Sequence, residues 1–293
     1  MTNKLPKGVG VALVTPFDAN LNIDFSAYKR LLEHTAQIGV DYWVVQGTTG
    51  ESPTTTFAEK AQLLAFAKEN NPKKLPIVYG MGGNNTETII QNIKNTDLEG
   101  VTALLSVSPY YNKPSQRGII AHYQKIADVS PVPIVLYNVP GRTGSNITAE
   151  TTLALAEHPN IIATKEASGN LVQCMEIAKN KPKDFMLISG DDMLTVPMIS
   201  FGAEGVISVM ANAFQEFNDM SHLALEKNFE AASQKLFSLL TLNDLMYIEG
   251  NPVGIKQVLT FQGVCSSNVR LPLVEASEKL SEQIKKGLEE LKK

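Results

Sequence analysis

The chain has 293 residues, 43% of them hydrophobic and 19% charged, which is typical of a folded protein with a large core. Its net charge of -4, without a basic patch, argues against nucleic acid as a partner. No membrane span or signal peptide is indicated, so we expect no membrane partner. Cys174 and Cys265 lie far apart and form no C-x-x-C motif, which favours reduced thiols and a cytoplasmic location.

The chain begins with alternating strand and helix patterns. Residues 8–17 are a buried strand pattern that Pro16 ends. Asp24 is placed to cap the following helix, whose apolar residues recur every three or four positions until Gly39. A second strand pattern follows at 42–45.

A loop rich in hydroxyl groups occupies residues 47–52, and Thr56 with Glu59 then has the spacing of a capping box for the next helix. Further strand patterns lie at 76–82, 102–107, 133–137, 161–165, 185–189 and 205–209. Eight strand patterns that alternate with helical ones predict a (β/α)8 TIM barrel. An open doubly wound sheet is disfavoured, because the glycine cluster at 80–85 lacks the last glycine of G-x-G-x-x-G.

Strand patterns end near residue 213, and helical periodicity takes over. We therefore expect a catalytic barrel over residues 1–224 and a small C-terminal helical domain over residues 225–293. One face of a final amphipathic helix is predicted to carry Leu273, Leu280, Ile284, Leu288 and Leu291. This helical domain would cover one side of the barrel or serve an oligomer interface.

Lys165 lies near the end of the sixth strand pattern, just before Ala167-Ser168-Gly169. The carboxyl ends of barrel strands are where such folds place their chemistry. Burial favours the neutral form of an amine, and a neutral amine can attack a ketone to form a Schiff base. The structural alternative is a strand-end lysine whose amine extends to water.

Other polar residues also follow strand patterns, and a closed barrel would bring them to one face. They are Thr48, Thr49, Tyr110, Tyr111, Tyr137 and Arg142. Singly, each could be a turn residue, a packing residue or a surface charge. Together with an amine they suit Schiff-base chemistry on a keto acid, in which hydroxyls move protons and a guanidinium binds a carboxylate.

Neither a metal nor a cofactor is expected. His34, His122, His158 and His222 lie in helical segments without ligand spacing. Asp191 and Asp192 are adjacent carboxylates at a strand end, which is a weak signal for a divalent ion. No Ser-His-Asp arrangement or G-x-S-x-G motif is present either.

Several motifs resemble those of the dihydrodipicolinate synthases, which belong to the pyruvate-dependent class I aldolase superfamily together with N-acetylneuraminate lyase. The longest are Gly47-Thr48-Thr49-Gly50-Glu51, Tyr110-Tyr111-Asn112, Tyr137-Asn138-Val139-Pro140-Gly141-Arg142-Thr143 and Lys165-Glu166-Ala167-Ser168-Gly169. Gly190-Asp191-Asp192, Gly205-Val206-Ile207-Ser208 and Asn251-Pro252 match as well. The resemblance covers nearly the whole chain.

The resemblance implies four catalytic residues: Lys165, Tyr137, Thr48 and Tyr111. Lys165 would form a Schiff base with pyruvate. The three hydroxyl groups would relay protons, with Tyr111 reaching into a neighbouring subunit of a homotetramer built as a dimer of dimers.

The resemblance also implies the substrate contacts and the product. Thr49 would bind the carboxylate of pyruvate and Arg142 that of L-aspartate 4-semialdehyde, while Gly190 and the backbone of Ile207 would line the pocket. The product would be 4-hydroxy-tetrahydrodipicolinate, on the route to diaminopimelate and lysine. Arg142 favours this activity over N-acetylneuraminate lyase, which generally lacks the arginine. The alternative of another class is a non-catalytic barrel that binds a keto acid.

Those members of this family that are inhibited by lysine bind the lysine at a dimer interface. Ser52, Asn84 and Tyr110 match that allosteric site. Phe57 and Lys60, however, stand at histidine positions, and Thr88 stands at an acidic one. A lysine facing the ligand's ammonium and a missing carboxylate both disfavour binding, so we predict weak or absent inhibition by L-lysine.

Overall fold

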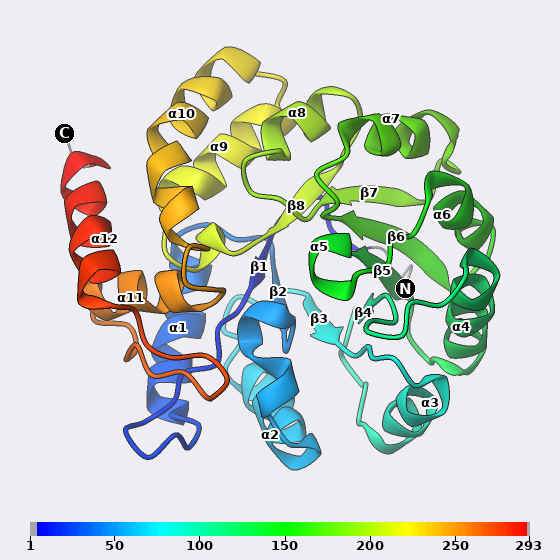
Figure 1. Cartoon of the computed structure of the whole chain (residues 1–293), viewed down its shortest axis with the longest axis horizontal. Helices are drawn as coiled ribbons and strands as arrows, with labels where there is room; N and C mark the ends of the chain where they lie inside the picture. The colour runs from blue at the N-terminus through cyan, green and yellow to red at the C-terminus, as the bar shows by residue number, and fades with distance from the viewer. Residues whose placement is uncertain (1–4, 292–293) are drawn as a thin grey trace.

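The computed structural model describes residues 5–291, which form a closed barrel of eight parallel strands in sequence order (Figure 1). The predicted (β/α)8 barrel is therefore confirmed. The strands are β1 (Gly8–Ala12), β2 (Tyr42–Val45), β3 (Ile77–Gly80), β4 (Ala103–Val107), β5 (Ile134–Asn138), β6 (Ile161–Glu166), β7 (Met186–Ser189) and β8 (Gly205–Ser208).

Helices follow the strands and surround the barrel in Figure 1. They are α1 (Phe25–Gln37), α2 (Phe57–Glu69), α3 (Thr86–Asn95), α4 (Gln116–Val129), α5 (Pro140–Thr143), α6 (Ala149–Ala156), α7 (Leu171–Asn180) and α8 (Thr195–Ser200). The side chain of Asp24 accepts a hydrogen bond from the backbone N–H of Ala27 at 2.9 Å and so caps α1. Thr56 and Glu59 form the expected capping box at the start of α2.

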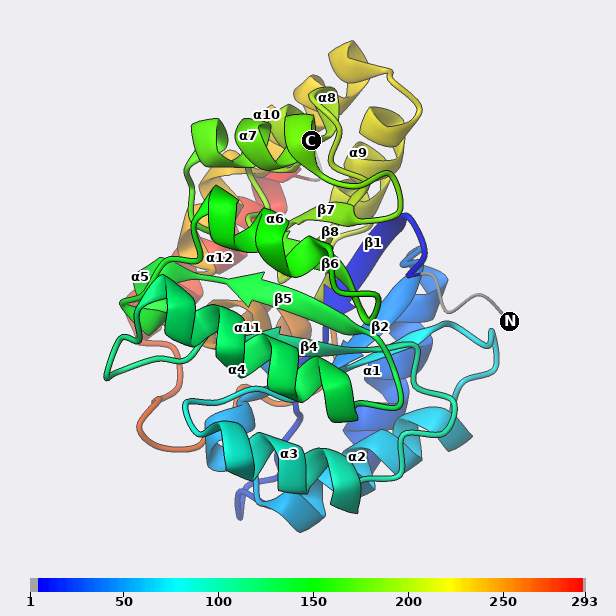
Figure 2. The same cartoon turned by 90° about the vertical axis from the view of Figure 1, so that its right-hand side faces the viewer.

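Two apolar layers hold the strands in place. One fills the barrel interior with side chains such as Val44, Val135 and Ile188, and the other lies between the strands and the helices. Successive strand residues point to opposite faces, which is why both layers draw on the same strands. Figure 2 shows α4 and α6 lying along β5 and β6.

Four more helices lie together on one side of the barrel (Figure 1): α9 (Gln215–Leu225), α10 (Phe229–Leu245), α11 (Val253–Phe261) and α12 (Glu278–Leu291). The outer apolar layer continues from the barrel into these helices without a break, as far as Ile284. The division into domains at residue 224 stays a prediction. No helix within residues 5–291 is long and apolar enough to cross a membrane.

Two sequence-based boundaries were wrong. The first strand ends at Ala12 rather than near Phe17. Residues 13–17 stay buried, but the backbone N–H of Val14 donates to the side chain of Asn212 instead of to a neighbouring strand. The last helix begins at Glu278, so Leu273 lies in the segment before it and packs against the core from there. Leu280 and Ile284 are buried on the inner face of α12, as expected.

Candidate active site

Lys165 and Tyr137 lie side by side at the carboxyl ends of two neighbouring strands. Their Cα atoms are paired in the register of β5 and β6, and each residue is only 6% exposed. The Lys165 amine lies 4.5 Å from the centroid of the Tyr137 ring. Within residues 5–291 no carboxylate forms an ion pair with this amine, so its lone pair is available to a ligand once the amine is deprotonated.

Space for the Lys165 side chain depends on Gly190, which directly follows β7. A Cβ atom at this position would lie 2.9 Å from Lys165 Cε and 2.7 Å from the Cβ of Ala167. Both distances are shorter than contacts between carbon atoms permit. The glycine therefore leaves room for the lysine to extend along the barrel mouth.

The next residues along the two strands, Asn138 and Glu166, point away from the barrel interior and form a second cross-strand pair. The Asn138 amide donates to the Glu166 carboxylate at 2.9 Å. That carboxylate also accepts from the backbone N–H of Ser168 at 2.8 Å and from the side chain of Gln173 at 3.0 Å. Glu166 is thus a fully partnered buried charge that fixes the ends of the strands carrying Tyr137 and Lys165.

Thr48 and Thr49 lie on a short 3-10 turn, η1 (Thr48–Gly50), which begins three residues after the end of β2. The hydroxyl of Thr49 accepts a hydrogen bond from the side chain of Asn251 at 3.0 Å. The hydroxyl of Thr15 donates to the carbonyl of Gly50 at 2.7 Å and accepts from the side chain of Gln46 at 3.0 Å. These bonds hold the turn against the barrel.

A cavity of about 230 Å³ lies at this end of the barrel and collects most of the predicted site residues. Lys165, Tyr137, Thr48, Thr49, Arg142 and Gly190 all line it. Arg142 comes from α5, a single helical turn after β5 that the sequence did not predict. An amine, a phenol, two hydroxyls and a guanidinium therefore surround one small space.

Two predicted residues are not among those lining the cavity. Ile207 is buried in the barrel interior on β8. Tyr111 is 87% exposed, with a positive φ of 76°, and its side chain projects from the loop after β4. Within one chain, Tyr111 therefore lies outside the cavity that Lys165, Tyr137 and Thr48 line.

Sequence reasoning gave no role to four other polar residues that line the cavity, Asp191, Asn251, Asn243 and Tyr247. The last two reach the cavity from α10 and the segment after it, and nothing in their local sequence indicates this position. Desolvation of its hydroxyl group and the nearby carboxylates of Asp192 and Asp191 raise the pKa of Tyr247 well above its usual range, although the residue as a whole is 36% exposed. The amide oxygens of Asn243 and Asn251 have no partner among residues 5–291, which leaves them free to accept a hydrogen bond from a ligand.

The two adjacent aspartates serve mainly to hold the backbone. Asp192 accepts hydrogen bonds from the N–H groups of Met210 at 2.9 Å and Val209 at 3.2 Å, and burial raises its pKa to about 6. Asp191 accepts from the N–H of Met193 at 3.0 Å. Within the described part of the chain, no three His, Cys, Asp or Glu side chains are grouped as metal ligands.

A second cavity, of about 300 Å³, adjoins the first and shares Thr48, Tyr137 and Arg142 with it. Ser52, Tyr110 and Lys60 also line it, and the side chain of Asn84 donates to the carbonyl of Tyr110 at 3.3 Å. Burial lowers the pKa of Lys60. Ser52, Asn84 and Tyr110, which match the allosteric site in sequence, thus lie close together at this second cavity, and Lys60 lies beside them.

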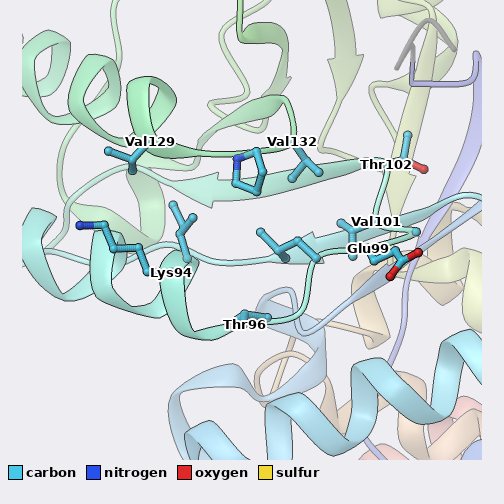
Figure 3. A pocket seen from close by; sticks show the side chains of 11 residues that line it. Lys94, Thr96, Glu99, Val101, Thr102, Val129 and Val132 are labelled. Carbon is cyan, nitrogen blue, oxygen red and sulfur yellow. The ribbon is translucent and has the colours of Figure 1, made fainter.

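A more open depression of about 670 Å³ lies at the opposite end of the barrel, next to the segments that precede β4 and β5 (Figure 3). Its charged residues are Lys94 and Glu99, and none of the predicted site residues lines it. In barrels of this type the amino-terminal end of the strands contributes stability rather than chemistry. The smaller cavity around Lys165 is therefore the better candidate for the active site.

A closed barrel with its reactive side chains at the carboxyl ends of the strands has the organisation of (β/α)8-barrel enzymes. The sequence matches the model of the dihydrodipicolinate synthetase family over residues 5–291. A 4-hydroxy-tetrahydrodipicolinate synthase from Cytophaga hutchinsonii is 52% identical over 281 residues, which cover 96% of this chain and 95% of the relative. The chain therefore belongs to the dihydrodipicolinate synthetase family, and the sequence-based predictions of this family and of an enzyme are confirmed.

Solved structures with the same fold include dihydrodipicolinate synthases of two other organisms. The Acinetobacter baumannii enzyme, described as chloride-inhibited and complexed with pyruvate, is 32% identical with a TM-score of 0.95, over 98% of this chain and 99% of that one. The Cyanidioschyzon merolae enzyme, solved with lysine bound, is 38% identical with a TM-score of 0.93, over 98% of each chain. These similarities extend along the barrel and the C-terminal helices alike.

Proposed function

We propose that this protein condenses pyruvate with L-aspartate 4-semialdehyde to give 4-hydroxy-tetrahydrodipicolinate, through a Schiff base on Lys165. The observation that carries the proposal is the buried Lys165 amine above the Tyr137 ring, in a cavity that also holds Thr48, Thr49 and Arg142. A cavity that only bound a keto acid would need no nucleophile. The membership of the family supports the same activity.

In the proposed reaction the neutral amine of Lys165 attacks the ketone carbon of pyruvate, and water leaves to give an imine. Loss of a proton from the pyruvate methyl group gives an enamine, whose carbon attacks the aldehyde. The amino group of the second substrate then attacks the imine carbon, which closes the ring and releases Lys165. Each step moves protons, and the hydroxyls of Tyr137 and Thr48 are proposed to carry them.

The two carboxylates of the substrates need separate partners. Thr49 is fixed by Asn251 and is proposed to bind the carboxylate of pyruvate. The Arg142 guanidinium lines both adjoining cavities and is proposed to bind the carboxylate of L-aspartate 4-semialdehyde in a bidentate manner. Gly190 and the backbone of Ile207 are proposed to complete the pocket.

We further propose a homotetramer in which Tyr111 of the partner subunit completes the proton relay. The exposure of Tyr111 and its position outside the cavity of its own chain support this. Sedimentation equilibrium would measure the mass of the assembly, and Tyr111→Phe should lower kcat without changing that mass. A fully active monomer would contradict both parts of the proposal.

The test of the reaction is to incubate the protein with pyruvate and borohydride and to map the modified residue by mass spectrometry. A reduced pyruvyl adduct on Lys165, absent in Lys165→Met, is the expected result. Product formation with L-aspartate 4-semialdehyde, and no release of pyruvate from N-acetylneuraminate, would identify the synthase activity. An unmodified protein would overturn the Schiff-base proposal and favour the non-catalytic barrel.

We also propose that L-lysine inhibits this protein weakly or not at all. Lys60 lines the cavity that holds Ser52 and Tyr110, and Thr88 on α3 offers no carboxylate to an ammonium group. Initial rates measured against L-lysine test this, with Lys60→His and Thr88→Glu combined as the variant expected to gain sensitivity. Half-maximal inhibition of the unmodified protein at micromolar lysine would contradict the proposal.

A further inference from the structure

The turn that carries Thr48 and Thr49 is joined to the C-terminal helices by a buried ion pair. Glu51 directly follows this turn, in the left-handed backbone region with φ of 54°, and is 2% exposed. Lys256 on α11 is 0% exposed, and its amine lies 2.5 Å from Glu51 Oε1. The two residues are 205 positions apart in the chain, so only the folded structure brings them together.

Both charges have further partners that fix their positions. The Lys256 amine also donates to the carbonyl of Asn268 at 2.7 Å and lies 4.4 Å from the centroid of the Phe17 ring. The second oxygen of Glu51 accepts from the backbone N–H of Arg270 at 2.9 Å. The carboxylate of Glu51 is therefore held from two points of the C-terminal segment, and its backbone has little freedom to move.

Such a pair is an expensive way to gain stability. Removing two charges from water costs several kcal/mol per ion, and well-packed apolar residues often serve stability as well or better. We therefore attribute to the ion pair mainly a structural effect: it fixes the position of Glu51, the residue that follows η1. The hydrogen bond from Asn251 to Thr49, at 3.0 Å, connects the same turn to the same C-terminal segment.

We propose that Glu51 and Lys256 are positioning residues, and that their ion pair fixes the turn so that Thr48 and Thr49 face the cavity of Lys165. Neither side chain lines that cavity, so they act through the backbone of the turn. The inference rests on the proposed function, in which Thr48 relays protons and Thr49 binds pyruvate. It predicts weaker binding of pyruvate and unchanged binding of L-aspartate 4-semialdehyde, because Arg142, the proposed partner of the second substrate, is carried by α5 on another part of the barrel mouth.

The test compares Glu51→Gln, Lys256→Met and the double variant with the unmodified protein. Each single change leaves an uncompensated buried charge or an unfilled hydrogen bond, so Tm should fall. The double variant removes both charges, so its Tm should recover in large part. Its KM for pyruvate should nevertheless rise, and its rate of adduct formation on Lys165 fall, by about 10- to 100-fold.

The KM for L-aspartate 4-semialdehyde should stay within about twofold of the value for the unmodified protein. A factor of two corresponds to a change of about 0.5 kcal/mol in the free energy of binding. Glu204→Gln is the matched control, because it breaks the ion pairs of Glu204 with Lys181 at 3.1 Å and with Lys7 at 3.0 Å, just before β8, and neither pair involves η1 or the partners of Glu51. It should leave both KM values unchanged. A double variant with normal Tm and normal pyruvate kinetics would overturn the inference, as would an equal rise in both KM values.

If the double variant does not fold, Glu51→Gln alone decides, measured well below its own Tm. Glutamine has nearly the same shape as glutamate, so this variant removes the charge without changing the packing. Normal pyruvate kinetics in this variant would therefore also overturn the inference. The unmodified protein separates the two proposals. Failure of its adduct with pyruvate rejects the proposed function, whereas a normal adduct there and in the Glu51 variants rejects only the positioning role.

Discussion

Tyr137 and Lys165 are paired across β5 and β6, and the lysine amine lies 4.5 Å from the centroid of the tyrosine ring. The next residues on the same strands, Asn138 and Glu166, pair on the opposite face at 2.9 Å. Alternation along a strand separates these two pairs. The inner pair faces the cavity, and the outer pair ties the two strand ends together.

Replacing Tyr137 by Phe separates the two roles of this side chain. The ring beneath the amine remains, while the hydroxyl proposed to move protons is lost. We expect kcat to fall by about 10²- to 10⁴-fold, the usual contribution of a general acid or base, and Tm to change little. Steady-state kinetics and thermal unfolding measure these effects, and a kcat within a factor of two of normal would exclude Tyr137 from the relay.

Glu166→Gln should destabilise the strand ends. The carboxylate accepts hydrogen bonds from Asn138, Ser168 and Gln173, and an amide in its place turns an NH₂ group towards one of these donors. We expect the free energy of unfolding to fall by about 1–3 kcal/mol, the cost of an unsatisfied buried polar group. Urea unfolding measures the change, and Glu176→Gln, at an exposed position on α7, should leave the stability unchanged.

Gly190→Ala should displace the Lys165 side chain, because the added methyl carbon would lie 2.9 Å from its Cε atom. We expect kcat/KM for pyruvate to fall by about 10- to 100-fold, since small misplacements of a reacting group have large effects. The overpacking should also cost about 1–3 kcal/mol of stability. Gly83→Ala is the control: its methyl group would meet Ile89 at an ordinary 3.8 Å, so both quantities should stay normal. Equal kinetics in the two variants would contradict the role given to Gly190.

The barrel could be predicted from the sequence because buried parallel strands are short apolar runs, separated by helices with clear caps such as Asp24 and Thr56. The grouping of Lys165, Tyr137 and Thr48 at one end of the barrel could be predicted too, because a closed parallel barrel brings the carboxyl ends of its strands together. That their roles are catalytic stays a prediction.

Other parts of the site could not be found in this way. Tyr247 and Asn243 come from helical sequence, and they reach the cavity only because long-range packing places α10 beside the barrel mouth. The pairing of Glu51 with Lys256 likewise depends on contacts across 205 residues. Local periodicity carries no information about contacts of this kind, since it reports only which face of an element is apolar.

A pH-dependent contribution to stability is expected at the other end of the barrel, where His222 Nε2 lies 2.8 Å from Asp41 Oδ2. The hydrogen bond to Asp41 raises the pKa of His222, opposed in part by burial and aided by the charges of Asp41, Asp219 and Glu226. Since the folded state favours the protonated imidazole, this stabilisation is fully present below the unfolded pKa of about 6.5 and is lost as the pH rises through the folded pKa.

The variant His222→Gln should therefore lower Tm most at acidic pH and progressively less at alkaline pH. Thermal unfolding of both proteins across a pH series measures the difference. In an Asp41→Asn background the same substitution should lose most of its pH dependence, because the hydrogen-bond partner that raises the pKa of His222 most is gone and only Asp219 and Glu226 still act on it. A difference in Tm that grew with pH would reverse the sign of the linkage and contradict a folded state that favours the charged imidazole.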